Sequence, residues 1–345
     1  MKLNRKLVDK LITFGIVVAA YLICKAMIAS GSMSRSLRGQ LVPICVYIIM
    51  AVSLNLTVGI SGELSLGHAG FMSVGAFSGI VTAMWLSKGI GFQNELITLI
   101  LAIIVGGCFA GFAGVLIGIP VLRLRGDYLA IVTLAFGEII RNVMNCIYIS
   151  LDGSRLHFGF LNPNLTGKLL VNGPTGATGV TKMASFDMGF VLVLVTLLVV
   201  LNLIDSRSGR AIMAIRDSRI AGESVGLQVT KYKMMAFVTS AVLAGMGGAL
   251  YGLNFSTVTA SKFKFDTSIL VLVFVVLGGI GNIRGSVIAA ALLTVLPELL
   301  RAFSDYRMLV YAIVLILVML ASNNPTIRSF LTSIRPGKGR RNTNE

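Results

Sequence analysis

Long apolar runs, separated by short polar segments, dominate the chain from Leu11 to Leu320. Most of these runs are long enough to cross a bilayer as a helix, because an apolar core about 30 Å thick needs about 20 residues. The pattern predicts ten spans. In the first half of the chain these are 11–29, 41–59, 68–86, 96–119 and 128–149, and in the second half 188–204, 234–254, 267–283, 285–303 and 308–321.

The composition indicates lipid rather than water as the solvent. Of the 345 residues, 55% are hydrophobic and 13% are charged, whereas about a quarter of an ordinary soluble domain is charged. We therefore expect an all-α fold, a polytopic bundle of membrane helices forming a single domain over 1–345. Two long connections, 150–187 and 205–233, and a basic tail, 322–345, stand apart from the short turns. In the 150–187 connection, the cluster of Gly and Pro from Asn172 to Gly179 predicts a structured loop rather than a helix.

The distribution of Lys and Arg predicts the side of the membrane that each connection faces. With the N-terminus inside, the inner segments hold 18 of the 30 basic residues and the outer segments hold ten, as the positive-inside rule requires. Both termini and the 205–233 connection then lie in the cytoplasm, and the 150–187 connection lies outside. The first apolar run follows basic residues as in a secretory signal peptide, but the continuing spans favour an uncleaved helix.

The remaining chemistry argues against an enzyme, a metalloprotein and a nucleic-acid-binding protein. The net charge of +16 comes from tails and short loops and forms no basic stripe. His68 and His157 are the only histidines, and the four cysteines have no metal-ligand spacing. The chain has no G-x-S-x-G, H-E-x-x-H or Walker A sequence, so we expect no catalytic residue, no metal and no cofactor.

Two glycine-rich polar segments, 54–76 and 277–285, interrupt the apolar runs. Non-helical backbone at membrane depth must be buried in protein or line a watery cavity, because unpaired amides cost several kcal/mol in hydrocarbon. A loose echo between the segments favours a repeat around a translocation route, although close helix packing also selects small residues. We expect His68 to cap or pack the broken helix. The candidate substrate-pathway residues are Ser61, Gly62, Glu63, Ser65, Gly67, His68, Gly278, Gly279, Gly281 and Asn282.

Glu138 and Arg141 lie near the middle of a predicted span, where charges are expensive. Their i, i+3 spacing places both on one helix face, which favours an ion pair facing the bundle. A proton relay or a contact with substrate is the alternative. Glycines four residues apart predict close approach of helices in the bundle, and these pairs are Gly107 and Gly111, Gly114 and Gly118, and Gly248 and Gly252.

The 205–233 connection mixes apolar positions with charged ones and predicts short amphipathic helices across the cytoplasmic face. An interfacial helix held by anionic lipid is one interpretation, and a docking element for a cytoplasmic partner is the other. Its sequences GRAIMAIRD at 209–217 and AGESVG at 221–226 resemble the ATPase-coupling loop of branched-chain amino acid ABC permeases of the LivM type. Gly222 stands where that family more often has alanine, so this turn is expected to be looser.

Three further segments, 54–76, 123–141 and 276–285, match the same family in order and spacing, so the resemblance covers about 41–303. It implies an ABC importer permease in the bacterial inner membrane, working by alternating access. The implied partners are a second related permease, two cytoplasmic ATP-binding subunits and an extracytoplasmic solute-binding protein. The implied cargo is leucine, isoleucine or valine; urea or short amides, or an ion-coupled secondary transporter working through Glu138, are the alternatives. The implied coupling residues are Gly209, Arg210, Arg216, Asp217, Glu223 and Gly226.

Overall fold

The computed structural model describes residues 5–300, apart from 93, 125, 154 and 162–166, and also Leu309, Ala312, Ile313 and Ile316. The chain divides into two compact units, Met1–Thr294 and Val295–Glu345. The helices, the sheet and the cavities discussed below belong to the first unit, except that the last described helix runs across the division. The predicted span 308–321 and tail 322–345 fall almost entirely outside the described residues.

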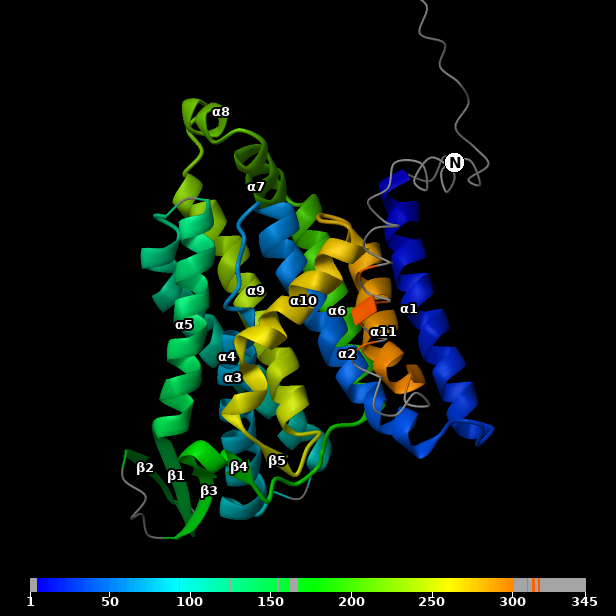
Figure 1. Cartoon of the computed structure of the whole chain (residues 1–345), viewed down its shortest axis with the longest axis vertical. Coiled ribbons are helices and arrows are strands. Elements are labelled where there is room, and N and C mark those ends of the chain that lie inside the picture. Colours follow the sequence, from blue (N-terminus) through cyan, green and yellow to red (C-terminus); the bar gives the residue numbers. More distant parts are fainter. Residues whose placement is uncertain are drawn as a thin grey trace, which may run out of the picture. The chain divides into compact units, whose positions relative to one another are not determined.

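Helices make up most of the described chain, which confirms the all-α membrane bundle (Figure 1). Seven of them are long and apolar enough to cross a membrane; two shorter ones follow, and the total of ten spans stays a prediction. The seven are α1 (Arg5–Ala29), α2 (Arg35–Asn55, continued by the π-helical turn η1, Leu56–Ile60), α3 (His68–Met84, continued by η2, Trp85–Gly89), α4 (Glu95–Val121), α5 (Asp127–Cys146), α6 (Phe186–Asp205) and α9 (Val229–Gly252). The shorter two are α10 (Phe265–Gly278) and α11 (Ile283–Leu299).

The connection after α5 folds into an antiparallel sheet that the sequence analysis did not predict. Its strand order is β2-β1-β3-β4-β5. The strands are β1 (Ile147–Asp152), β2 (Arg155–Phe160), β3 (Lys168–Asn172), β4 (Ala177–Thr178) and β5 (Thr257–Val258). The predicted span 128–149 was therefore too long, because the β-branched and aromatic residues after Cys146 pair as a strand instead of extending the helix. The structured loop was predicted correctly, since its Gly-Pro segment forms only a 3₁₀ turn, Gly173–Thr175.

Helix α9 lies against α2, α3 and α4, and glycines set the spacing between these helices. A Cβ added to Gly248 would lie 2.0 Å from the carbonyl oxygen of Met72. One added to Gly107 would lie 2.7 Å from Met246 Cγ, so α4 also touches α9 closely. The glycine pairs predicted to allow close helix approach are confirmed in this role. Close packing of this kind holds the helices together, because the hydrophobic effect contributes little to helix association in lipid.

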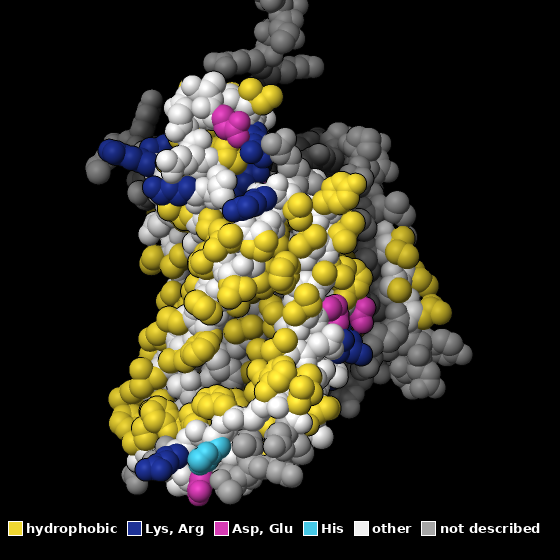
Figure 2. Space-filling view, turned by 90° about the vertical axis from the view of Figure 1, so that its left-hand side faces the viewer, with side chains coloured by type: hydrophobic (Ala, Val, Ile, Leu, Met, Phe, Trp, Pro, Cys, Tyr) yellow, Lys and Arg dark blue, Asp and Glu magenta, His cyan; other side chains and the backbone are white. Residues whose placement is uncertain are grey.

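The outer surface carries large apolar side chains where a bilayer would cover it. On α4, Ile104, Phe112 and Leu116 are exposed, as are Ile131 and Ile139 on α5. Figure 2 shows hydrophobic side chains across the middle of one face, with most Lys and Arg side chains towards its two ends and a basic side chain beside acidic ones at its right-hand edge. This banded surface fits a multi-pass membrane protein.

The two long connections lie at opposite ends of the bundle (Figure 1). Helices α7 (Arg207–Asp217) and α8 (Arg219–Ser224) form from the 205–233 connection, as predicted, at the end where α1 begins. An ion pair of 2.5 Å between Lys10 and Asp205 ties α1 to α6 at this end. The sheet lies at the other end, so the structure agrees with the alternation of sides. Which end faces the cytoplasm stays a prediction.

The close approach at Gly248 leads to the first testable prediction. We expect Gly248→Ala to lower the free energy of unfolding by roughly 1–3 kcal/mol, the usual cost of overpacking, because the new methyl group meets backbone rather than a flexible side chain. Thermal unfolding of the purified protein in detergent would measure this. Gly39→Ala is the matched control, since Gly39 is also helical but has open space around its Cβ position. Equal melting temperatures for both variants would contradict the packing argument.

Candidate functional site

The first interruption of the bundle follows α2, where the chain leaves regular helix at η1. The amide of Glu63 donates to the carbonyl oxygen of Thr57 at 3.0 Å, and that of Ser61 donates to Leu56 at 3.1 Å. Gly62 has φ +76, a conformation that a side chain disfavours. The following residues run without helix until α3 begins at His68. The predicted break is therefore present, and its backbone groups are partly satisfied by the preceding π turn.

The second interruption lies between α10 and α11. Gly279 and Gly281 have φ +92 and +82. The Asn282 side chain accepts a hydrogen bond of 3.3 Å from the Gly285 amide and so caps the first turn of α11. Gly278 lets α10 and α11 touch, because a Cβ there would lie 2.3 Å from the amide nitrogen of Ser286. These glycines thus serve a tight reversal between two helices.

The two interruptions touch each other through Asn55, a fully buried residue near the end of α2. Its Oδ1 accepts a hydrogen bond of 2.8 Å from the Gly281 amide, and its Nδ2 donates one of 2.8 Å to Ser286 Oγ. Gly59 permits this contact, because a Cβ on it would lie 2.3 Å from the Gly281 nitrogen. Asn55 was not among the residues predicted from the sequence. The sequence does indicate such a residue, because a carboxamide inside an apolar run needs hydrogen-bond partners when it is buried.

Helix α7 is hydrogen-bonded directly to the first interruption. Arg216 Nη1 donates to the carbonyl oxygen of Gly59 at 2.7 Å, while its Nε and Nη2 donate to Asp217 Oδ1 at 3.0 and 2.9 Å. The Arg216 side chain also covers Gly62, where an added Cβ would lie 2.7 Å from Arg216 Cγ. Gly209 lets α7 pack on the end of α6, because a Cβ there would lie 2.0 Å from the Leu203 carbonyl oxygen. Two of the predicted coupling residues therefore anchor α7 to the bundle.

The other predicted coupling residues lie on the outside. Arg210 donates to the Asp205 carbonyl oxygen at 2.9 Å, and Glu223 forms an ion pair of 2.8 Å with Arg219 along α8. Gly226 follows α8 with φ +80. Exposed apolar side chains accompany these charges on and just after α8, where Ile220 is 82% exposed and Val225 75%. This end of the connection therefore combines exposed charges with exposed apolar side chains.

Buried polar contacts line the first interruption. Glu63 forms an ion pair with Lys233 of α9, and both side chains are largely buried. His68 Nε2 lies 2.8 Å from Ser53 Oγ, so the histidine packs the start of α3 as expected. The hydroxyls of Ser61 and Ser65 are buried without a hydrogen-bond partner among the described residues. Lys233 was also missed by the sequence analysis, since a basic residue at the edge of a span looked like an ordinary loop cation.

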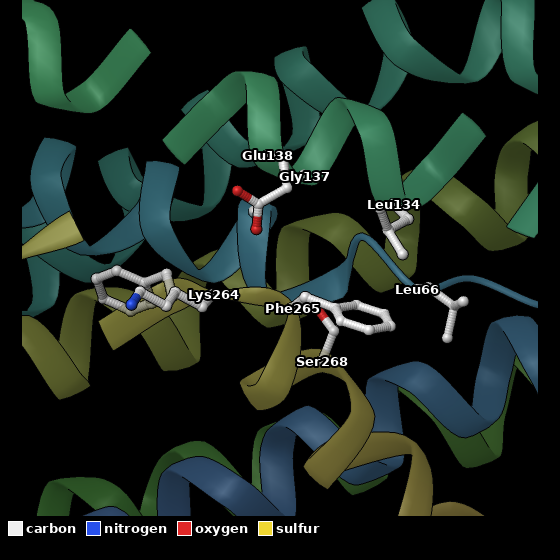
Figure 3. Close-up of a pocket in the computed structure, with 9 residues that line it drawn as sticks. Leu66, Leu134, Gly137, Glu138, Lys264, Phe265 and Ser268 are labelled. Carbon is white, nitrogen blue, oxygen red and sulfur yellow. The ribbon is translucent and has the colours of Figure 1, made fainter. Parts of the chain in front are cut away.

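Helix α5 approaches the interruption closely at Gly67, where a Cβ would lie 2.1 Å from the Thr133 carbonyl oxygen. The Leu66 amide donates to Thr133 Oγ1 at 3.0 Å. One turn further along α5, Arg141 Nε lies 2.7 Å from Glu138 Oε2, on one helix face. Figure 3 shows Glu138 at a small cavity between α5 and the start of α10.

A larger cavity of about 460 Å³ lies at the α7 end of the bundle, among α1, α6, α7 and the second interruption. Gly281 and Asn282 line it, whereas Gly278 and Gly279 are not among its lining residues. Arg216 and the ion-paired Lys10 and Asp205 give it a polar wall. The structure therefore brings the second interruption and α7 together at one cavity.

This arrangement, with broken helices inside a membrane bundle and short charged helices at one end, is that of a transport permease. A family model described as "Branched-chain amino acid transport system / permease component" matches residues 37–319. The chain belongs to this family.

Curated relatives agree with the family assignment. The high-affinity branched-chain amino acid transport system permease proteins LivM of Salmonella typhimurium and Escherichia coli are each 34% identical over 309 residues, 80% of this chain and 66% of theirs. This chain thus spans just under two thirds of the length of these relatives. The ribose import permease protein RbsC of Escherichia coli is 27% identical over 292 residues, 80% of this chain and 81% of its own. No solved structure matches the chain.

The contact between the interruptions gives a second prediction. We expect Asn55→Ala to lower the free energy of unfolding by about 1–3 kcal/mol, because the part-buried Gly281 amide and the buried Ser286 hydroxyl lose their partner. Asn202→Ala, on an exposed position of α6, removes the same carboxamide without such a loss and should leave stability within about 0.5 kcal/mol. Thermal unfolding in detergent compares the two, and a stable Asn55→Ala protein would disprove the bridging role.

Proposed function

We propose that the protein is the membrane-spanning permease subunit of an ATP-driven ABC importer for branched-chain amino acids. Family membership and the similarity to the two LivM proteins support this cargo. The observation that carries the proposed mechanism is the hydrogen bond from Arg216 of α7 to the Gly59 carbonyl oxygen. It links an exposed helix at one end of the bundle to a broken helix in its interior.

The proposed importer contains four further subunits: a second related permease, two cytoplasmic ATP-binding subunits and an extracytoplasmic solute-binding protein. The sequence has no Walker A motif, so ATP hydrolysis is assigned to the ATP-binding subunits. The exposed surface of α8, with Glu223, Ile220 and Val225, suits docking to one of them. The complex is assigned to the bacterial inner membrane, with both termini and α7 in the cytoplasm.

A movement of α7 would be transmitted to both interruptions through direct contacts. Arg216 donates a hydrogen bond to the Gly59 carbonyl oxygen. Gly59 lies against Gly281, whose amide donates a hydrogen bond to Asn55. A displacement of α7 caused by ATP binding would therefore shift the η1 turn and the second interruption together. Single π-helical turns often occur at functional sites because their spare backbone groups accommodate such shifts. Alternating access follows when the two permeases rearrange around these segments.

Substrate would pass the broken helices, where polar groups are available at membrane depth. The buried hydroxyls of Ser61 and Ser65 lack partners among the described residues. Together with backbone groups of the interruptions, they provide hydrogen bonds for an ammonium or a carboxylate, while the surrounding apolar residues accommodate an aliphatic side chain. We propose that the other candidate residues also line this pathway: Gly62, Glu63, Gly67, His68, Gly278, Gly279, Gly281 and Asn282.

Reconstitution tests the class of transporter. Vesicles containing this protein with its partner permease, ATP-binding subunits and solute-binding protein should accumulate leucine, isoleucine and valine only when ATP is present. Urea and ribose serve as competing cargoes for the same complex. Accumulation driven by an ion gradient in vesicles that contain this protein alone would overturn the ABC assignment in favour of a secondary transporter.

Replacing Arg216 tests the coupling route. In the complete complex, Arg216→Met should reduce amino acid uptake roughly tenfold, because a lost charge-assisted hydrogen bond is worth about 1.5–3 kcal/mol, while ATP hydrolysis continues. Arg207→Met is the control, since Arg207 is exposed at the start of the same helix. Parallel measurement of uptake and phosphate release separates uncoupling from loss of assembly. Uptake equal in the two variants would remove Arg216 from the route.

A further inference from the structure

A small cavity between α5 and the start of α10 combines a carboxylate, an exposed ammonium and an apolar wall. Glu138 stands about 16 Å along α5 from its first residue, halfway through the helix. Lys264, just before α10, lines the same cavity. The apolar side chains around it are Leu66, Leu134, Phe263 and Phe265. Ionisable groups at this depth are costly and usually mark a pathway or a binding site.

The two charged groups come from different elements and are not paired with each other. Glu138 Oε2 lies 2.7 Å from Arg141 Nε. Lys264 forms no ion pair with any residue that the structure describes. Figure 3 shows the Glu138 carboxylate projecting from α5 towards the segment that carries Lys264, Phe265 and Ser268. The Glu138 carboxylate and the Lys264 ammonium thus line the same cavity, and each can still contact a ligand.

Two helices begin at this cavity, which adds to its attraction for an anion. Gly70 lies in the first turn of α3 and Ser268 in the first turns of α10, and both line the cavity. The Ala69 amide donates to Ser268 Oγ at 3.0 Å, which holds the two helix starts together. Neither N-cap residue, Gly67 or Lys264, supplies a side-chain cap, although the Ser268 hydroxyl accepts from one first-turn amide of α3. The positive ends of two helix dipoles therefore reinforce Lys264.

We propose that this cavity is the closed form of a binding site for a zwitterionic amino acid with an aliphatic side chain. Glu138 receives the α-ammonium group, and Lys264 with the two helix starts holds the α-carboxylate. Leu66, Leu134 and Phe265 contact the aliphatic side chain. This inference rests on the proposed function, because it places the amino acid cargo at a specific point of the pathway.

The volume shows that the site is closed in this structure. About 10 Å³ is open in it, which holds about one water molecule. An amino acid enters only when α5 moves away from the start of α10. Helix α5 suits this movement, because only Leu129, Ala130 and Thr133 are buried along its described length. Apart from the close contacts of Gly67 with Thr133 and Gly137, few buried contacts oppose its displacement.

Uptake by the complete reconstituted complex tests the two charges separately. We expect Lys264→Met to reduce leucine uptake at least tenfold and Lys264→Arg to restore much of it, because the charge is what holds the carboxylate. Lys262→Met is the matched control, since Lys262 is exposed in the same connection but does not line the cavity. Uptake by Lys264→Met equal to that of the control would overturn the assignment of Lys264.

Glu138 needs a test that separates substrate contact from a structural ion pair. If Glu138 only neutralises Arg141, the double variant Glu138→Gln with Arg141→Met restores the uptake that Glu138→Gln alone loses. If Glu138 binds the ammonium group, the double variant remains at least tenfold below wild type, while Arg141→Met alone retains uptake. Full recovery in the double variant would overturn the proposed role of Glu138.

A photoreactive leucine that carries a diazirine locates the cargo directly. In the complete complex during ATP turnover, mass spectrometry should find its adducts on peptides containing Leu134 or Phe265. Adducts confined to other segments would overturn the site while leaving the importer assignment intact. Failure of the wild-type complex to take up any branched-chain amino acid would instead contradict the proposed function, so the two failures are distinguishable.

Discussion

Unpaired backbone groups cannot remain in hydrocarbon, and this constraint governs how the broken helices are arranged. Each interruption of a membrane helix frees amides and carbonyls that cost several kcal/mol without a partner. Here the two interruptions satisfy one another: the Asn55 carboxamide joins the end of α2 to Gly281 and Ser286. Arg216 of α7 donates a hydrogen bond to the Gly59 carbonyl oxygen. The same hydrogen bonds that make the breaks tolerable therefore connect them to the end of the bundle.

Close backbone contact is the second feature that shapes the bundle. Glycines at the contacts of α9 with α3 and α4 bring main chains within reach of each other, as at Gly248 and Met72. Dispersion forces then hold helices that lipid would otherwise solvate equally well. By contrast, α5 is mostly uncovered along its described length. The bundle thus combines a tightly packed centre with a peripheral helix that carries the Glu138 and Arg141 pair.

In the part of the bundle that the structure describes, two largely buried charges are paired with each other. Glu63 of the first interruption pairs with Lys233 at the start of α9. Removing one member of such a pair usually costs about 3–5 kcal/mol, because the other is left buried alone. The first interruption is thus attached to α9 through this pair and to α7 through Arg216. A segment held from two helices responds to the movement of either one.

The sequence by itself was sufficient for the membrane bundle, the positions of most helices, both interruptions and the short helices α7 and α8. These features follow from local patterns: apolar run length, glycine clusters and amphipathic spacing act over neighbouring residues. In the sheet, the pairing of β4 with Thr257 and Val258 joins distant segments, whereas the hairpin of β1 and β2 is local and its first residues were predicted as the end of a helix. Asn55 and Lys233 were not predicted because their partners are distant in the sequence. Their importance depends on partners far along the chain, and only tertiary structure decides which distant groups meet.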